Sequence, residues 1–318
     1  MLQGSSEEGF GRLLPRLCLP LGYQFDLDLS MYPSFVSSLY VRIAAQRWRR
    51  VIGASHIVFI ESGRVCCEGD GCSIELVEKL SGLWCMERCL RGIAASKYSE
   101  PLRQLLMAYR GLSVSAAGPG DELLVASAVV LSRRTSYARN VRRWMYIIFK
   151  HTKSLYEAAE RAARLPSPQP RLLAAILHEL AETLQEGCTS PWRLRQRLLG
   201  IPGVGPKTAD AILLFTGCSS RVAPGDVHLA RFTEMVLGWR LHPPLKNRCL
   251  RTASCMECTY AASCLTGRIV REFGDGAGLV QTLAYVHDSL GGRGGWRARL
   301  EEVLAKHYTS SGGTSSGR

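Results

Sequence analysis

The sequence predicts a mainly helical protein with a strand-rich, α+β lobe at its N-terminus. Three observations support this fold class. The chain of 318 residues is long enough for two domains, β-rich runs lie before residue 75, and apolar residues recur at helical spacing after residue 122. We therefore expect a loose leader, an N-terminal α+β lobe, a helical domain and a disordered tail, over residues 1–20, 21–117, 118–306 and 307–318.

The N-terminal lobe is expected to contain a β-hairpin followed by helices. His56–Ile60 is rich in β-forming residues, Glu61-Ser-Gly63 is a turn signal, and Arg64–Cys67 can return as the partner strand. Residues 74–110 have helical patterns. The Gly/Pro-rich segment 116–121 then breaks the chain, and we expect the domain boundary there.

The helical domain is predicted from its apolar spacing. Leu123–Leu131 is apolar on all sides, which predicts a buried helix, and the proline-rich segment 165–170 predicts a rigid loop. Ser190-Pro191 is typical of a helix start, with serine as the cap and proline at the first position. Two further helices are expected from apolar stripes over 172–184 and 279–290.

Composition excludes some classes of protein. Hydrophobic residues make up 46% and charged residues 21%, which are ordinary globular values. The longest mainly apolar stretch, Leu123–Leu131, has nine residues including Ser127, so no membrane-spanning helix is expected. The acidic start, MLQGSSEEGF, argues against a secretory signal. We expect an intracellular monomer, cytoplasmic and nucleoid-associated if the source is prokaryotic.

The charge suggests a polyanionic partner. Forty Lys+Arg against 27 Asp+Glu give a net charge of +13, which suits nucleic acid, although solubility or genome bias are alternative explanations. Only seven of the 40 basic residues are lysines, so 33 are arginines. A lysine in a motif is therefore harder to dismiss as a surface residue.

The segment Trp192–Phe215 predicts two helices joined by a tight turn. One helix ends near Gly200, the turn Ile201-Pro-Gly-Val-Gly205 follows, and a second helix begins at Pro206. Glycines two apart let the backbone turn closely and leave N–H groups pointing outward at a helix N-terminus, where they can hold a phosphate. An ordinary helix–turn–helix packing element would have the same bare turn.

This segment resembles the helix-hairpin-helix (HhH-GPD) DNA glycosylase superfamily, which includes endonuclease III and 8-oxoguanine DNA glycosylase. The family motif Leu-Pro-Gly-Val-Gly-x-Lys-x-Ala is matched by Ile201-Pro-Gly-Val-Gly-Pro-Lys-Thr-Ala209. The family's downstream loop, which commonly ends Val-Asp-x-His, is matched by Val222-Ala-Pro-Gly-Asp-Val-His228, with Gly225 where an apolar residue is usual. The polar segment 131–137 also resembles a DNA-facing segment, and the resemblance covers about residues 118–290.

The resemblance implies catalytic roles for Lys207 and Asp226. A neutral lysine amine can attack the sugar C1′ and form an imine, after which β-elimination can cut the strand. The helix N-terminus and partial burial would both favour a neutral Lys207. Asp226 could accept a proton from Lys207, stabilise the cationic sugar, or cap the helix that follows it. Expected DNA-binding residues are Gly203, Val204, Gly205, Thr208 and His228, with His228 structural or on the phosphate side.

A damaged nucleotide must leave the base stack before C1′ can be reached. The pocket that receives it is expected between the two lobes, with aromatic walls. Tyr137, Trp144 and Phe232 are candidates, although their helical spacing fits core positions equally well.

Four of the 12 cysteines are clustered, and the other eight are expected to be mostly thiols in a chain with no export signal. The cluster is Cys249, Cys255, Cys258 and Cys264, within residues 249–264. Four thiolates can hold a [4Fe–4S] cluster or tetrahedral zinc, and spacing alone does not decide between them. Endonuclease III and its relatives carry [4Fe–4S] on a similar set, which favours iron–sulfur with a structural role.

The sequence thus favours a base-excision-repair enzyme. We expect a DNA glycosylase with AP lyase activity that removes an oxidised base from double-stranded DNA through a Lys207 Schiff base. One alternative is a monofunctional glycosylase for alkylated bases. Another is a non-catalytic DNA-binding module with a structural metal.

Overall fold

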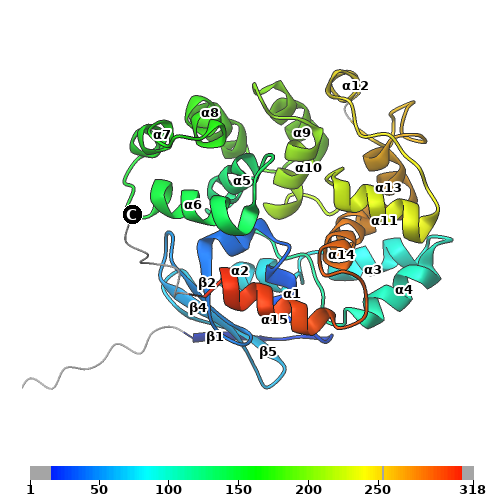
Figure 1. The fold of residues 1–318 in the computed structure, drawn as a ribbon, viewed down its shortest axis with the longest axis horizontal. Coiled ribbons are helices and arrows are strands. Elements are labelled where there is room, and N and C mark those ends of the chain that lie inside the picture. Colours follow the sequence, from blue (N-terminus) through cyan, green and yellow to red (C-terminus); the bar gives the residue numbers. More distant parts are fainter. Residues whose placement is uncertain (1–15, 253, 310–318) are drawn as a thin grey trace, which may run out of the picture.

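A five-stranded antiparallel sheet underlies the N-terminal lobe, and helices make up the rest of the chain (Figure 1). The computed structural model describes residues 16–252 and 254–309. The strands are β1 Arg16–Pro20, β2 Tyr40–Ala44, β3 Arg47–Arg50, β4 His56–Glu61 and β5 Arg64–Gly69, in the order β1-β5-β4-β3-β2. The predicted fold class, a helical protein with a strand-rich N-terminal lobe, is confirmed.

The predicted hairpin is the centre of this sheet. β4 and β5 pair from His56 opposite Gly69 to Glu61 opposite Arg64, so the turn falls at the predicted Ser62-Gly63. Trp48 of β3 is fully buried, and its indole N–H donates to Asp28 Oδ1 at 2.7 Å. This sheet face is therefore part of the core.

The expected leader and tail are wrong where the structure describes them. Residues 16–20 form β1, which pairs with β5, while residues 1–15 lie outside the described residues. His307 ends a helix, and Tyr308 is buried against Trp48 of the sheet. Residues 310–318 lie outside the described residues. β1 was missed because strand pairing is non-local, so five residues carry little signal of it.

Fifteen α-helices are described. In the N-terminal lobe they are α1 Leu27–Met31, α2 Ile74–Ser81, α3 Met86–Ala94 and α4 Ser99–Ala108. The next group is α5 Glu122–Leu131, α6 Arg142–Phe149, α7 Leu155–Ala163, α8 Pro168–Gln185, α9 Pro191–Gly200 and α10 Pro206–Phe215. The last is α11 Val227–Leu237, α12 Lys246–Arg251, α13 Leu265–Phe273, α14 Ala277–Ser289 and α15 Trp296–His307. Short helical turns of other types are Phe35–Leu39 (3₁₀), Tyr137–Val141 (π) and Gly274–Gly276 (3₁₀).

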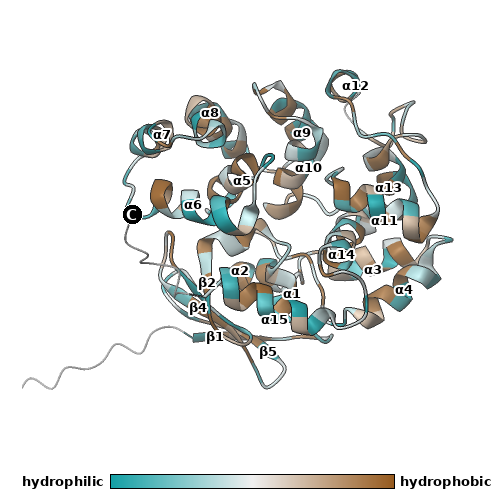
Figure 2. Cartoon of the chain, viewed as in Figure 1, coloured by the Kyte–Doolittle hydropathy of each residue, from teal (hydrophilic) through white to brown (hydrophobic). Residues whose placement is uncertain are grey.

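Hydropathy explains which helices are central. α5 is buried along most of its length, as its apolar sequence predicts, and α8 carries both apolar and polar residues, as expected of a helix with one outer face (Figure 2). α8 begins at Pro168, inside the expected rigid loop, because proline is tolerated in a first helical turn.

The C-terminal helix returns to the N-terminal lobe. Arg297 of α15 pairs with Asp26 at 3.0 Å, and Glu301 pairs with Arg42 of β2 at 2.9 Å. Thr309 forms an isolated parallel bridge with Arg42. The helical domain expected over 118–306 therefore includes a last helix that packs on the sheet lobe.

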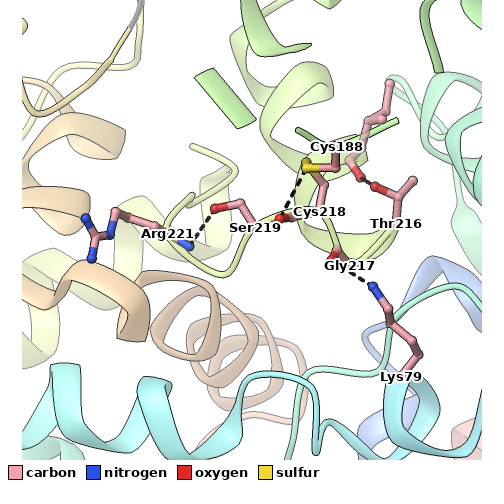
Figure 3. The surroundings of a disulfide bond; sticks show 8 residues. Lys79, Cys188, Thr216, Gly217, Cys218, Ser219 and Arg221 are labelled. Carbon is pink, nitrogen blue, oxygen red and sulfur yellow. Dashed lines mark hydrogen bonds between the residues drawn. A yellow bond between two sulfur atoms is a disulfide. The ribbon is translucent and has the colours of Figure 1, made fainter. Parts of the chain in front are cut away.

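Six cysteines are paired, which corrects the expectation of thiols. The disulfides are Cys18–Cys66, Cys67–Cys72 and Cys188–Cys218. The third encloses α9, the turn and α10. Beside it, Lys79 of α2 reaches across to donate to the Gly217 carbonyl at 2.9 Å (Figure 3). This contact ties the hairpin to the N-terminal lobe.

Among the described residues, no helix combines the length and the apolar character needed to cross a membrane.

Candidate active site

The helix-hairpin-helix lies at the predicted position. α9 ends at Gly200 and α10 begins at Pro206, so residues 201–205 form the turn. Gly203 has φ +79°, a conformation that favours glycine, and an added Cβ would also lie 2.7 Å from Leu172 Cδ1, which would have to move. A Cβ at Gly205 would meet open space, so that glycine leaves the N-terminus of α10 accessible.

The predicted DNA-binding residues of the turn differ in exposure. Gly203 is exposed and Gly205 is half-buried. Val204 is buried, and its N–H donates to the Ile201 carbonyl at 3.1 Å, so this residue holds the turn together. Thr208 is also buried, but it lines the cavity described next.

A cavity of about 470 Å³ opens beside the turn, and we call it the turn cavity. Its charged lining residues are all basic among the described residues: Arg133, Arg134, Lys207 and Lys246. Arg134 has φ +48°, a strained conformation for a residue with a side chain, and such residues concentrate at functional sites. The cavity combines cationic side chains with a helix N-terminus, and this combination suits an anion.

A second cavity of about 190 Å³ lies between the two lobes, and we call it the interlobe cavity. Lys207 lines both cavities, and Asp226 lines this one with it. The side chain of Lys207 is exposed, so the expected partial burial is wrong for the free protein. The structure therefore brings the two predicted catalytic residues to one cavity, from the first turn of α10 and the start of α11.

The two carboxylate oxygens of Asp226 have different contacts. Oδ1 accepts from the Leu229 backbone N–H at 2.8 Å and caps α11. Oδ2 has one weak contact, 3.5 Å from the Gln281 Nε2 donor. An added Cβ at Gly225 would lie 2.9 Å from both Pro244 Cδ and Thr266 Oγ1. Close packing thus explains the glycine before Asp226.

Gln281 of α14 is a site residue that sequence reasoning missed. Its side chain is 5% exposed and lines the interlobe cavity, and its Oε1 has no hydrogen-bond partner among the residues that the structure describes. A buried polar atom without a partner is costly, so such an atom often awaits a ligand. The signal in the sequence was a single amide within the apolar run Gly278–Val286.

Aromatic side chains wall the interlobe cavity: Tyr32, Phe35, Tyr137, Phe215 and Tyr285. Phe35 packs edge-on against Tyr137 and Phe215, with ring centroids 5.3 and 5.1 Å apart. Of the three aromatic candidates from the sequence, only Tyr137 is here. Trp144 and Phe232 are buried core residues, the alternative that their helical spacing left open.

His228 also lines the interlobe cavity, but its ring is already engaged. Nδ1 lies 2.6 Å from Asp288 Oδ2, and the ring packs edge-on against Tyr285. These contacts suit the structural role expected for it.

The four clustered cysteines lie in the segment from α12 to the residue that directly precedes α13. Cys249 lies in α12, and Cys264 precedes Leu265 as the α13 cap. All four are free thiols, and burial raises the pKa values of Cys249, Cys255 and Cys264. Their charges interact with one another. However, no group of three or more His, Cys, Asp or Glu side chains within 16–252 and 254–309 is arranged to hold a metal ion.

Comparison with known proteins identifies solved structures of the same fold. No family model matches the sequence, and no curated protein sequence matches it. Among solved structures, an 8-oxoguanine glycosylase/lyase from Clostridium acetobutylicum in complex with DNA has a TM-score of 0.60 at 11% identity, covering 91% of this chain and 99% of that one. A 3-methyladenine DNA glycosylase from Archaeoglobus fulgidus has a TM-score of 0.58 at 18% identity, covering 87% and 99%.

A third similar structure is MBOgg1 in complex with a low-affinity DNA ligand, with a TM-score of 0.58 at 13% identity, covering 85% of this chain and 94% of that one. At these identities the likeness shows the fold. The chain therefore has the same fold as these three structures, over 94–99% of the length of each.

Proposed function

We propose that this protein is a DNA glycosylase with AP lyase activity, which removes an oxidised base from double-stranded DNA. One observation carries the proposal: Lys207 and Asp226 line the same aromatic-walled cavity between the lobes. The fold likeness to 8-oxoguanine and 3-methyladenine glycosylases supports base release as the reaction class.

Lys207 is the proposed nucleophile. Its neutral Nζ attacks C1′ of the flipped nucleotide, the bond from C1′ to the base breaks, and the base leaves with the bonding electrons. Loss of a proton from nitrogen and opening of the sugar give an imine between Nζ and C1′. The imine makes the C2′ proton acidic, so β-elimination of the 3′ phosphate follows.

Asp226 is the proposed electrostatic partner. Because Oδ1 is fixed by the Leu229 N–H, Oδ2 is the oxygen left to face positive charge developing at the sugar. The same oxygen can take a proton from the attacking amine. The turn cavity, with four basic side chains, would hold the neighbouring phosphates.

Gln281 supports recognition of a base within the same cavity. Its unpartnered Oε1 can accept from a base N–H, while the aromatic walls offer faces for stacking.

A [4Fe–4S] cluster held by Cys249, Cys255, Cys258 and Cys264 is the proposed cofactor, with zinc as the alternative. The type of donor supports the proposal, because four thiols lie within 16 residues and Arg195 Nη2 lies 3.7 Å from Cys249 Sγ, where it can donate to a thiolate. The side chains of the described residues are not arranged as a ligand set, so the segment would have to rearrange to bind the cluster. Such a cluster would fasten the segment 249–264 as a structural element. Absorbance near 400 nm with iron and sulfide analysis distinguishes it from zinc.

Borohydride trapping tests the proposed reaction. The protein is mixed with duplexes that carry an abasic site, 8-oxoguanine, an oxidised pyrimidine or an alkylated base, and reduced. We expect a covalent band that disappears in Lys207→Gln and persists in the control Lys246→Gln, since both lysines line the turn cavity. Base release without any trapped band would replace the lyase with a monofunctional glycosylase. DNA binding without base release would leave a binding module.

A further inference from the structure

The short helix α12 is the link between the turn cavity and the four clustered cysteines. It carries Lys246, which lines the turn cavity, and Cys249, the first of the four. No residue of α12 is buried, so apolar packing contributes little to holding it. Its position must depend on a few polar contacts.

One contact comes from the turn itself. Lys246 Nζ donates to the Ile201 carbonyl at 3.3 Å, which joins the first residue of α12 to the hairpin turn. This side chain is half-exposed and flexible, so alone it fixes the helix weakly.

The second contact comes from inside the hairpin. Arg195 of α9 is 1% exposed, and it forms a two-point ion pair with the fully buried Asp210 of α10. The same guanidinium donates from Nη2 to Asp210 Oδ2 at 3.2 Å and to Cys249 Sγ at 3.7 Å. The Asp210–Arg195–Cys249 contacts therefore join both hairpin helices to α12.

We propose that Arg195 is a positioning residue that fastens α12 to the hairpin and so holds Lys246 beside the DNA-binding turn. A planar guanidinium can serve two acceptors at once, whereas a lysine ammonium on a different stem can neutralise Asp210 but not also reach Cys249.

Arg195→Lys is the direct test, and Arg197→Lys is its matched control on the same helix, where Arg197 pairs with Glu186 at the surface. Amide hydrogen exchange is measured on the purified full chain. We expect residues 246–251 and 201–205 to exchange about tenfold faster in Arg195→Lys, as loss of one charge-assisted hydrogen bond implies, and to be unchanged in Arg197→Lys. Equal exchange in the two variants would overturn the proposal.

A second pair of variants removes the contact from its other side. Cys249→Ala and Cys258→Ala each delete one of the four clustered thiols, but only Cys249 contacts Arg195. Metal content is measured in both variants and in the unaltered protein. We expect faster exchange of residues 201–205 in Cys249→Ala than in Cys258→Ala. If Arg195→Lys fails to fold, these two cysteine variants test the proposal in its place. Equal exchange of residues 201–205 in Cys249→Ala and Cys258→Ala would contradict the proposal.

The prediction about DNA affinity rests on the function proposed above. Affinity is measured with a duplex that carries a stable abasic-site analogue, and the trapping rate at saturating enzyme is measured separately. We expect Arg195→Lys to bind about tenfold more weakly and to react at a rate within about twofold of the unaltered protein. A slowed reaction with unchanged affinity would contradict a positioning role. If the unaltered protein does not bind DNA, both the proposed function and the prediction about DNA affinity are wrong. Hydrogen exchange would still decide whether Arg195 fastens α12.

Discussion

The two carboxylate oxygens of Asp226 have different partners, which would let this residue combine helix capping with its proposed catalytic role. Oδ1 caps α11, and Oδ2 faces the interlobe cavity with only the Gln281 contact. The sequence motif predicted both tasks for this residue, since an aspartate before Val-His-Leu is a typical cap. Their compatibility became clear only from the separate directions of the two oxygens.

Asp226→Asn should separate catalysis from folding. Asparagine caps a helix nearly as well as aspartate, so we expect little change in the unfolding temperature. Base release should fall by at least about 100-fold because the anionic charge near C1′ is lost. Single-turnover base release and fluorescence anisotropy test this, with Asp275→Asn as a surface control. Unchanged base release would show that the assignment of Asp226 is wrong.

Gln281→Leu should reveal base recognition. The substitution keeps the side-chain size and removes the unpartnered acceptor, so we expect slower release of an oxidised base by about tenfold or more. Cleavage at a preformed abasic site should fall much less, because no base is present there and only the weak 3.5 Å contact with Asp226 Oδ2 is lost. Single-turnover rates on the two substrates provide the measurement. An equal loss on both would place Gln281 in the chemistry or in folding.

At the scale of elements, local motifs were predicted more accurately than distant pairings. The bounds of the hairpin followed from Gly200, the Gly203–Gly205 pair and Pro206, whose conformational preferences act locally. β1 and the return of α15 to the sheet were missed, because each depends on partners far along the chain. α12 and its contact with Arg195 were missed for the same reason.

The Cys188–Cys218 disulfide should stabilise the hairpin element. It joins residues 30 apart and encloses α9, the turn and α10. We expect the double variant Cys188→Ser/Cys218→Ser to lose about 2–4 kcal/mol of unfolding free energy, from the added freedom of the unfolded chain. Urea unfolding under non-reducing conditions tests this. The variant Cys85→Ser, at a free buried thiol, controls for the loss of a cysteine. A midpoint equal to that of the unaltered protein would contradict the prediction.

At the scale of the whole molecule, the charge of +13 indicated the sign of the partner but not the place where it binds. The structure gathers four basic side chains of the helical part at the turn cavity, adjacent to the interlobe cavity through Lys207. A cavity with aromatic walls lies between the lobes, where the pocket was predicted, and its role in receiving a nucleotide stays a prediction. Its walls could be named only after Tyr32 and Phe35 of the N-terminal lobe were seen to face α10 and α14.

DNA affinity should depend steeply on salt. If the four basic residues of the turn cavity each neutralise one phosphate, the slope of log K against log salt is about −3.6, at −0.9 per phosphate. Arg133→Ala should make the slope less negative by about 1, whereas Arg103→Ala, a surface residue paired with Glu100, should leave it unchanged. Anisotropy titrations at several salt concentrations provide the slopes. A flat dependence would exclude phosphate neutralisation as the source of affinity.

The Cys188–Cys218 bond also makes the hairpin a closed covalent ring. A protease that cuts once between residues 188 and 218 opens the ring but leaves both fragments joined through sulfur. The nicked protein therefore migrates as one species until a thiol reductant is added. A cut outside the ring has no such protection, unless another crosslink spans it. Limited proteolysis with and without reductant can thus report whether the turn is reached by a protease, before any DNA is present.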